Sequence, residues 1–318
     1  MLAIDQLFLH LKRPDPGCFY PSKDPRDIRL ADMISSEPED FDCSQIVLLS
    51  CSQDQGVIRN NGRAGAAKGP EEIRKALYRL AAPDYLAPGD LFDLGDNAIG
   101  GSLEEIHQRQ FEIVSTLLAQ SKKVIVLGGG NDLSYPDCRA YRTVYPTGLT
   151  VNVDAHLDIR RSPVANSGTP YRQLIDEKII RPGDLVEFGI QRQSNSKIYL
   201  ADARKMGIQV HMIEEIQQKA LADVLDRSLE ELNSGHLFLG FDMDSICSAD
   251  APGVSAPSPV GFSAREAVSI VRRIISNHRV DLLEITEMNP LYDQDSKTAR
   301  LASMLAYTYL EYCRLDSI

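Results

Sequence analysis

The sequence predicts an α/β fold of one domain, built on a mostly parallel β-sheet with helices on both faces. From about residue 46 onward, short apolar runs alternate with helical patterns. Strands that alternate with helices form parallel sheets through crossover connections. The runs are almost continuously apolar, which is typical of strands buried on both faces. No repeat, low-complexity segment or linker divides the chain, so we expect a single domain over residues 1–318.

Each expected element follows from its own pattern. The strands are expected at Ile46–Cys51, Leu91–Leu94, Val124–Leu127, Leu149–Val153, Asp184–Ile190, Ile208–His211, Leu237–Asp242 and Asp281–Glu287. The helices are expected at Pro70–Ala81, Leu103–Gln120, Tyr171–Asp176, Asn195–Lys205, Ile213–Leu232, Ala264–Ser276 and Ser296–Cys313. Pro70 suits the first turn of its helix, where Glu71 and Glu72 favour the helix dipole. Residues 1–42 are rich in proline and aspartate, which favours an N-terminal extension on the surface or at a subunit contact.

Composition excludes several classes of protein. The net charge of −11 and the pI near 5.1 argue against nucleic acid or an anionic membrane as a partner. No apolar run reaches the roughly 20 residues that span a bilayer, and Met1–Pro14 lacks the basic start of a signal peptide. The six cysteines are scattered without a CxxC pair, which indicates reduced thiols. We therefore expect a cytoplasmic protein whose main partner is neither nucleic acid nor a membrane.

Acidic residues follow two of the expected strands. Asp154, His156 and Asp158 stand at alternate positions, so in an extended strand all three side chains would share one face. Asp242 and Asp244 are spaced in the same way. Because the ends of parallel strands meet at one edge of a sheet, these groups are expected to converge there. Four carboxylates and one imidazole would repel one another without cations, and they suit two divalent ions such as Mn²⁺ that activate water.

Other motifs are weaker when taken alone. The loop Gly128–Asp132 follows an apolar strand and lacks the phosphate-binding lysine, so its glycines are expected to bring backbone close to the metals. The loop Ala251–Pro257 is either a rigid turn or a stiff wall beside the site. Glu287 closes the last expected strand. Arg160, Arg161, Arg172 and Arg192 fall in loops, where one or two of them could clamp a substrate carboxylate. The other histidines have no ligand-like spacing and are expected to be surface or structural residues: His10, His107, His211, His236 and His278.

Taken in order, these motifs resemble the ureohydrolase family, which includes arginase, agmatinase and formimidoylglutamase. The resemblance extends from about Gly56 to the last helix, and its details are most similar to formimidoylglutamases. The segments that carry it are Gly56–Pro70, Gly128–Asn131, Asp154–Asp158, Asn166–Tyr171, Asp242–Asp244, Ala251–Ala256 and Glu287–Pro290. The resemblance implies a three-layer α/β/α fold around an eight-stranded parallel sheet, a pair of Mn²⁺ ions and a homo-oligomer, either a trimer or a hexamer.

The resemblance also implies ligand sets and catalytic roles. One metal would be bound by Asp154, Asp158, Asp242 and the residue at position 131, and the other by Asp154, His156, Asp242 and Asp244. A metal-activated hydroxide would attack the sp² carbon of the substrate. Asp158 would orient it and pass its proton to the leaving amine, with His156 also part of the catalytic group. Glu287 would hold the cationic amidine or guanidine group.

The implied reaction is hydrolysis of N-formimidoyl-L-glutamate to L-glutamate and formamide, a step of histidine catabolism. The two substrate carboxylates would be bound by Arg172 and Arg192, with Tyr171 as a further substrate-binding residue. Tyr171 stands where arginases carry a proton-shuttling histidine, which argues against arginase itself.

A second departure leaves alternatives open. Asn131 stands where the family normally has histidine, and an amide oxygen is a weaker ligand than an imidazole nitrogen. The site would then hold two metals with one bound weakly, or a single metal, or Asp132 would replace Asn131. The alternative functions are hydrolysis of another guanidino compound, as in agmatinase or arginase, and a metal-poor, non-catalytic protein with a structural or regulatory role.

Overall fold

The computed structural model describes residues 4–97, 100–230 and 235–313. Its centre is a nine-stranded sheet with the strand order β1-β3-β2-β4-β9-β8-β5-β6-β7. The strands from β2 to β9 run parallel to their neighbours, and β1 alone among the described strands is antiparallel. The strands are β1 (Leu11–Lys12), β2 (Ile46–Cys51), β3 (Leu91–Asn97), β4 (Lys123–Gly128), β5 (Leu149–Val153), β6 (Leu185–Ile190), β7 (Gln209–Met212), β8 (Leu237–Asp242) and β9 (Val280–Thr286).

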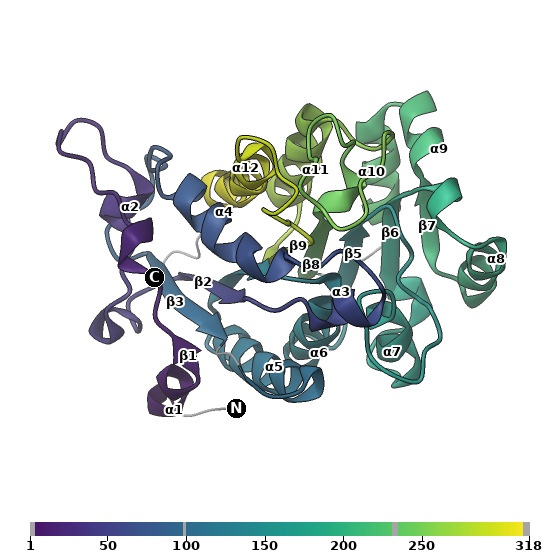
Figure 1. Ribbon diagram of the computed structural model, residues 1–318, viewed down its shortest axis with the longest axis horizontal. Helices are drawn as coiled ribbons and strands as arrows, with labels where there is room; N and C mark the ends of the chain where they lie inside the picture. Colours follow the sequence, from purple (N-terminus) through teal and green to yellow (C-terminus); the bar gives the residue numbers. More distant parts are fainter. Residues whose placement is uncertain (1–3, 98–99, 231–234, 314–318) are drawn as a thin grey trace.

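Helices cover both faces of the sheet and complete three layers (Figure 1). One layer packs α4, α9, α10, α11 and α12 on the sheet, and the other packs α1, α5, α6, α7 and α8 on the opposite face. The helices are α1 (Ile4–Leu9), α2 (Leu30–Met33), α3 (Gln55–Arg59), α4 (Gly69–Leu77), α5 (Leu103–Ala119), α6 (Ser134–Val144), α7 (Pro170–Asp176), α8 (Lys197–Met206), α9 (Ile213–Gln218), α10 (Leu221–Glu230), α11 (Ala264–Asn277) and α12 (Lys297–Tyr312). The predicted three-layer fold with eight parallel strands is confirmed, and the short β1 is an addition to it.

Local signals explain where several helices begin. Ser102 and Ser263 each accept a hydrogen bond from the third helical residue, Glu105 or Glu266, whose side chain binds back to the serine N–H. This capping box satisfies two backbone groups that the first turn would leave open. Pro70 lies in the first turn of α4, as predicted, with Glu71 and Glu72 beside it.

The helix expected over Ile213–Leu232 is wrong as a single element. Lys219 adopts an extended backbone that ends α9, and α10 begins at Leu221. The two short helices pack on different partners, α9 on β6 and β7 and α10 on α11. The end of the expected helix lies outside the described residues. Helices α3 and α6 were not predicted. In α6, Pro136 lies in the first turn, where proline is tolerated.

The N-terminal extension packs along one edge of the sheet. Strand β1 pairs with the end of β3, and Leu7 of α1 is fully buried. Gly95 makes the pairing possible, because a Cβ there would lie 2.2 Å from the Lys12 carbonyl oxygen and its φ is +100°. The extension therefore belongs to the packed structure.

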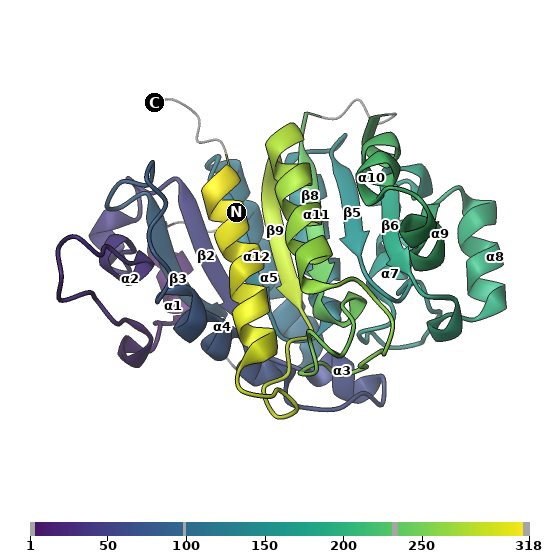
Figure 2. The same ribbon diagram turned by 90° about the horizontal axis from the view of Figure 1, so that it is seen from above.

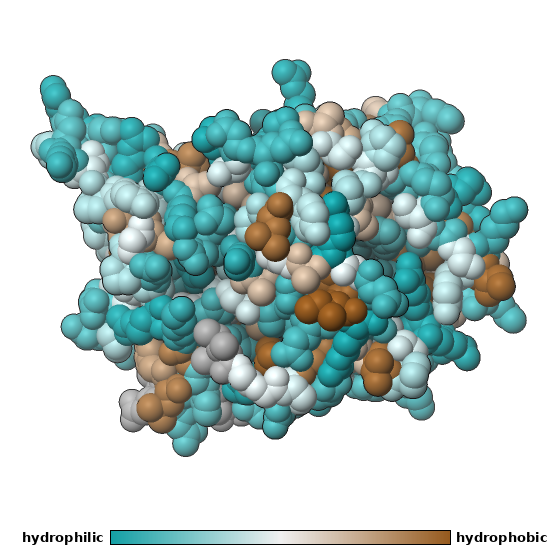
Figure 3. All heavy atoms as spheres, in the orientation of Figure 1, coloured by the Kyte–Doolittle hydropathy of each residue, from teal (hydrophilic) through white to brown (hydrophobic). Residues whose placement is uncertain are grey.

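The four neighbouring strands β4, β9, β8 and β5 form the middle of the sheet. All run in one direction, so the loops that follow them gather at one edge together with α3 (Figure 2). The face seen in Figure 3 is mostly hydrophilic, with apolar side chains in small separate patches. Among the described helices, none is long and apolar enough to cross a membrane.

Candidate functional site

The first acidic segment is a loop and not the end of a strand. Strand β5 ends at Val153, and Asp154, His156 and Asp158 follow it in irregular backbone. Asp154 Oδ1 accepts the backbone N–H of His156 at 2.7 Å, and Asp158 has a φ of +46°. The three side chains converge through this tight turn, so the expected strand alternation is wrong although the residues meet.

The second acidic segment reaches the same place from β8. Asp242 ends the strand, and Asp244 lies in the short 3-10 helix Met243–Ser245. Asp242 Oδ1 accepts the N–H of Asp244 at 2.8 Å. His156 Nδ1 lies 3.2 Å from Asp244 Oδ2 and 3.5 Å from Asp154 Oδ1. Among the described residues, Asp154, His156 and Asp244 form a group whose ligand atoms all lie within 4.8 Å of one another.

Asn131 joins Asp158 to this group. Its Nδ2 donates to Asp158 Oδ2 at 2.6 Å and lies 3.3 Å from Asp154 Oδ2. Its Oδ1 accepts from the hydroxyls of Ser134 and Thr286, both at 3.0 Å. The amide therefore presents its nitrogen to the carboxylates, an orientation assigned from the hydrogen-bond network.

The glycine loop after β4 positions Glu287. Glu287 follows β9 with a φ of +65°, donates its N–H to the Gly129 carbonyl at 2.8 Å, and accepts the Asn131 N–H on Oε1 at 2.9 Å. A Cβ on Gly129 would lie 1.7 Å from the Gln53 carbonyl oxygen. The glycine therefore permits close packing on the segment after β2, not the approach to the metals that we expected.

Asp132 faces away from this group of ligands. Its Oδ2 accepts from Gln53 at 2.8 Å and lies 2.7 Å from His107 Nε2. A replacement of Asn131 by Asp132 as a ligand is therefore wrong, because the two side chains point in different directions. His107 is the buried structural residue that we expected.

The site concentrates negative charge in a buried space. Burial, followed by the neighbouring carboxylates, raises the pKa of Asp154 and Asp242. Burial and Asp154 raise the pKa of Asp158 to about 8. Burial opposes protonation of His156, yet Asp244 and Asp154 raise its pKa well above the usual value. Burial also raises the pKa of Glu287.

The chemistry of these groups fits divalent metal ions. Among the described residues, no lysine or arginine forms an ion pair with Asp154, Asp158, Asp242 or Asp244. Asp244 Oδ1 is buried with no hydrogen-bond partner. Buried carboxylates are normally paired with cations or coordinate metals. Oxygen ligands with one imidazole suit Mn²⁺.

A pocket of about 280 Å³ opens over these groups. Acidic and amide residues form its floor. Its rim comes from the segment that follows α3 and from the loops after residues 158, 166 and 254. Ser255 and Ala256 form part of the wall, as the stiff-wall interpretation of Ala251–Pro257 predicted. The lining residues are Asn60, Asn61, Gly62, Arg63, Asn131, His156, Asp158, Arg160, Ser167, Asp242, Asp244, Ser255, Ala256 and Glu287.

Three predicted substrate-binding residues lie elsewhere. Tyr171 is fully buried in the core, and its hydroxyl has no hydrogen-bond partner. Arg172 pairs with Asp176 one turn along α7, at 2.7 Å. Arg192 lies in the 3-10 helix Arg192–Ser194, and neither arginine lines the pocket. Sequence distance from the acidic motifs was a poor guide to these positions.

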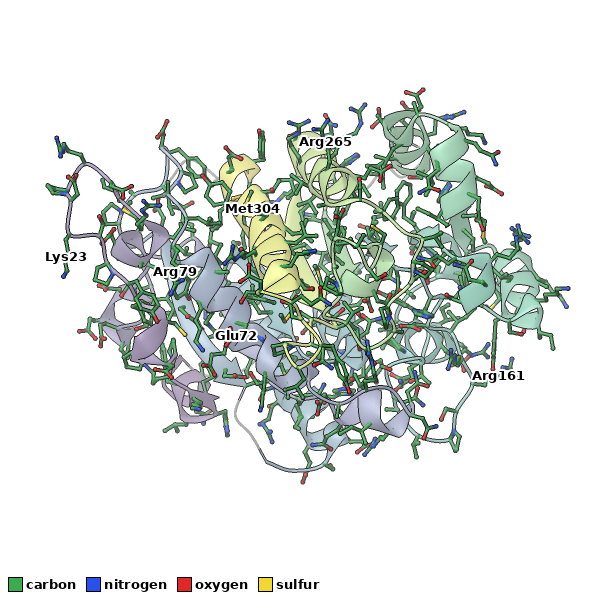
Figure 4. The ribbon with its side chains drawn as sticks, turned by 45° about the horizontal axis from the view of Figure 1, so that its top comes forward. Lys23, Glu72, Arg79, Arg161, Arg265 and Met304 are labelled. Carbon is green, nitrogen blue, oxygen red and sulfur yellow. The ribbon has the colours of Figure 1, made fainter. Side chains whose placement is uncertain are left out.

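Two arginines line the pocket instead. Arg160 Nη1 lies 3.2 Å from Asn60 Oδ1, beside Ser167. Arg63 is committed to the wall, because its Nε and Nη2 donate to the carbonyls of Ser255 and Val254 at 2.9 and 2.5 Å. Arg160 is one of the four loop arginines that we expected as candidates for binding a substrate carboxylate. Arg161, the next of the candidate loop arginines, lies at the periphery of the molecule (Figure 4).

Comparison with known proteins finds relatives over most of the chain. The model of the Arginase family matches residues 44–311. The formimidoylglutamase of Paraburkholderia xenovorans is 33% identical over 281 residues, which cover 83% of this chain and 87% of the relative. That of Staphylococcus epidermidis is 32% identical over 266 residues, which cover 82% and 84%.

Solved structures are similar over most of the chain. The formiminoglutamase of Trypanosoma cruzi, solved with Mn²⁺, has a TM-score of 0.83 at 32% identity and covers 89% of this chain and 97% of its own. The formimidoylglutamase of Bacillus subtilis has a TM-score of 0.86 at 28% identity and covers 97% of each chain. The proclavaminate amidino hydrolase of Streptomyces clavuligerus has a TM-score of 0.76 at 25% identity, over 85% of this chain and 91% of its own. On the family match and these relatives, the chain belongs to the arginase family.

Proposed function

We propose that this protein is a Mn²⁺-dependent hydrolase of N-formimidoyl-L-glutamate that forms L-glutamate and formamide. The observation that carries the proposal is a buried group of acids and one imidazole on the floor of a pocket whose rim presents Arg160. The floor suits the activation of water, and the rim suits an anionic substrate. The formimidoylglutamases among the relatives support this choice of substrate.

The ligand sets follow from which side chains converge. Asp154, His156, Asp242 and Asp244 would hold one Mn²⁺, and Asp154, Asp158, Asp242 and Asn131 the other. Asn131 becomes a ligand if its amide turns over, so that Oδ1 faces the carboxylates. Its Nδ2 would then donate to Ser134 and Thr286, whose hydroxyls accept as readily as they donate.

Bound metal would supply a water of lowered pKa near neutral pH. Asp158 then acts on the proton: it orients the attacking water, accepts a proton from it and delivers that proton to the leaving amine. Glu287 lies on the pocket floor, held by the Asn131 N–H, and would bind the amidinium group of the substrate. His156 Nδ1 contacts Asp154 and Asp244 in the metal-free arrangement, and the neutral imidazole would bind the metal in place of these contacts.

Substrate carboxylates are assigned to Arg160 in place of Arg172 and Arg192. The only partner described for its guanidinium is the neutral Asn60 amide, so its charge is not matched by a carboxylate. Asn60 and Ser167, which hydrogen bond to each other at 3.0 Å, would add neutral donors beside it.

Metal analysis coupled to three hydrolysis assays tests the proposal. Protein purified with Mn²⁺ is expected to carry close to two ions per chain and to release glutamate from formimidoylglutamate faster than it cleaves arginine or agmatine. Faster cleavage of a guanidine would favour the second candidate, a guanidino hydrolase, which the likeness to proclavaminate amidino hydrolase supports. Little bound metal and no turnover would favour the non-catalytic alternative that Asn131 keeps open.

Three further properties belong to the proposal. The chain would act as a single domain, because one continuous sheet joins its N-terminal extension to its last strand. It would form a trimer or a hexamer. It would act in the cytoplasm, where its six unpaired cysteines would stay reduced.

A further inference from the structure

A second layer of acids lies in the protein interior behind the candidate ligands. Glu187 on β6, Glu284 on β9 and Asp137 on α6 are all fully buried, and none of them lines the pocket. No described lysine, arginine or histidine forms an ion pair with any of the three. The mechanism above assigns them no role.

Glu187 faces the side chain of Asn152, and the two match as an acid and an amide. Asn152 Nδ2 donates to Glu187 Oε2 at 2.9 Å. The other two oxygens, Glu187 Oε1 and Asn152 Oδ1, are both buried without a partner. A proton on Glu187 Oε1 would satisfy both at once, since an acid and an amide can bind through two parallel hydrogen bonds.

Glu284 and Asp137 form a second pair, in which both partners are acids. Their side chains lie within hydrogen-bonding reach of each other. Glu284 Oε1 and Asp137 Oδ2 are also buried without a partner, and one shared proton would satisfy both. Asp137 Oδ1 already accepts from Gln110 at 2.9 Å.

The contacts of the Ser134 hydroxyl also indicate a proton on the Glu284–Asp137 pair. Its oxygen lies 3.0 Å from Asn131 Oδ1 and 2.6 Å from Glu284 Oε2. A serine carries one hydrogen and cannot donate to both oxygens. While it donates to Asn131, the hydrogen of the shorter contact comes from Glu284. With the Asn131 amide turned over, Ser134 would donate to Glu284 Oε2, and the retained proton would lie between Glu284 Oε1 and Asp137 Oδ2.

Both acid pairs are one contact away from the candidate ligands. Asn152 Nδ2 lies 3.2 Å from Asp154 Oδ2 while it also binds Glu187. Ser134 lies between Glu284 and Asn131. Residues in such positions fix the orientation of metal ligands, and their loss typically costs 10- to 100-fold in metal affinity.

We propose that Glu187 and the Glu284–Asp137 pair are positioning residues that retain protons in the folded protein and thereby hold Asn152 and Ser134 against the ligands Asp154 and Asn131. The proposal rests on the proposed function only in calling Asp154 and Asn131 ligands. Neutral acids in this layer leave the ionised carboxylates at the pocket as the charges that two divalent cations would balance.

Burial and the surrounding charges agree with retained protons. Burial raises the pKa of Glu187, with Asp154 and Asp158 facing it and adding to the effect. Burial raises the pKa of Glu284, which faces Asp137 and Asp132, and raises that of Asp137 to about 7. Among the described side chains near Asp137, His107 lowers its pKa, and His107 Nε2 already lies 2.7 Å from Asp132 Oδ2. The Tyr171 hydroxyl lies among these acids and stays neutral.

Infrared spectroscopy of the Mn²⁺-loaded protein at pH 7 tests the protons directly. Glu187→Gln and Glu284→Gln are each expected to remove intensity from the carbonyl band of protonated carboxylic acids. Glu230→Gln, at an exposed position on α10, is the matched control and should remove none. Unchanged bands in both buried variants would overturn the proposal.

Mn²⁺ affinity tests the positioning role. Glutamine can keep both hydrogen bonds to Asn152, so Glu187→Gln should retain the affinity within about twofold, whereas Glu187→Leu should lose about 10- to 100-fold. Equal losses in the two variants would overturn the proposal. If Glu187→Leu does not fold, the retained proton on Glu187 is tested by unfolding Glu187→Gln and the unchanged protein in urea at pH 5 and at pH 8.

The retained proton makes the unchanged protein relatively less stable as pH rises. As pH rises, Glu187→Gln should therefore become more stable relative to the unchanged protein. The ratio of their folding equilibrium constants should grow by up to about tenfold per pH unit. An equal difference at both pH values would contradict a retained proton. The infrared and urea measurements involve no substrate. They can therefore contradict the retained protons while the proposed reaction is confirmed, or confirm the protons while the reaction is not observed.

Discussion

Two regions at the same sheet bury carboxylates in opposite ways. Asp93 on β3 is paired with Arg74 on α4 through two hydrogen bonds of 2.9 and 2.8 Å, and Tyr78 and the Gly95 N–H also bind it. Asp93 therefore has its counter-cation and a complete set of donors. The candidate metal group has four carboxylates, one imidazole and an unpartnered oxygen on Asp244. The first region is therefore complete as a protein structure, whereas the second is complete only with cations.

The largest expected effect is on the incomplete region. Asp242→Ala should remove bound Mn²⁺ and lower the rate of hydrolysis by about 10³-fold, the upper end of the loss expected for one electrostatic group. Metal analysis and the glutamate-release assay measure both. Asp223→Ala, an exposed change on α10, is the control. Full metal content in Asp242→Ala would break the comparison.

The complete region should respond through stability instead. Arg74→Leu leaves Asp93 buried without its cation, and breaking a buried pair in this way costs about 3–5 kcal/mol of unfolding free energy. Denaturation in urea measures the loss. In metal-free protein, Asp242→Asn should have the opposite sign and stabilise, because it removes one of several repelling charges. A destabilisation by Asp242→Asn as large as that of Arg74→Leu would argue that the two regions are alike.

The pH dependence of metal-free protein sharpens the contrast. Asp158, with a folded pKa of about 8, keeps a proton that the unfolded chain releases above about pH 4. His156 keeps a proton that the unfolded chain releases above about pH 6.5. Stability should therefore fall as pH rises from 5 to 8, by about 1 kcal/mol per pH unit for each group held protonated. Saturating Mn²⁺ should flatten or reverse this slope, and a slope unchanged by Mn²⁺ would contradict metal binding at these residues.

The arginines offer a smaller test of the same idea. Arg74 forms an ion pair with Asp93, whereas the contact described for the Arg160 guanidinium is to the neutral amide of Asn60. Arg160→Ala should raise the KM for formimidoylglutamate roughly 10- to 100-fold, the value of a charged hydrogen bond. It should leave the KM for agmatine, which has no carboxylate, nearly unchanged. Arg161→Ala is the matched control, and an equal effect in both variants would remove Arg160 from substrate binding.

The smallest effect is expected at Tyr171. Its hydroxyl is buried without a described hydrogen-bond partner, far enough from the pocket that it lines none of it. Tyr171→Phe should change the free energy of unfolding by less than about 1 kcal/mol and leave KM unaltered. A large rise in KM would restore the tyrosine to the substrate-binding group.

The sequence alone determined the elements whose signals are local. Strands β2, β5 and β8 have the predicted bounds, because each is a short, mostly apolar segment flanked by polar residues. Helices α5 and α11 begin where serine and glutamate form a capping box. The sequence also predicted acidic residues at the ends of β5 and β8. Because parallel strands run in one direction, it predicted that these acidic residues lie close together.

Which other residues join these acids depends on the tertiary structure. Arg160 and Arg172 both follow the first acidic motif, yet one reaches the pocket and the other is turned toward Asp176 by its helix. Asn152 and Glu187 lie on neighbouring strands far apart in the sequence, and their pairing depends on strand register. A side chain's role depends on its direction and on partners brought from distant segments. Apolar patterning encodes burial along one element, but it does not encode those directions or partners.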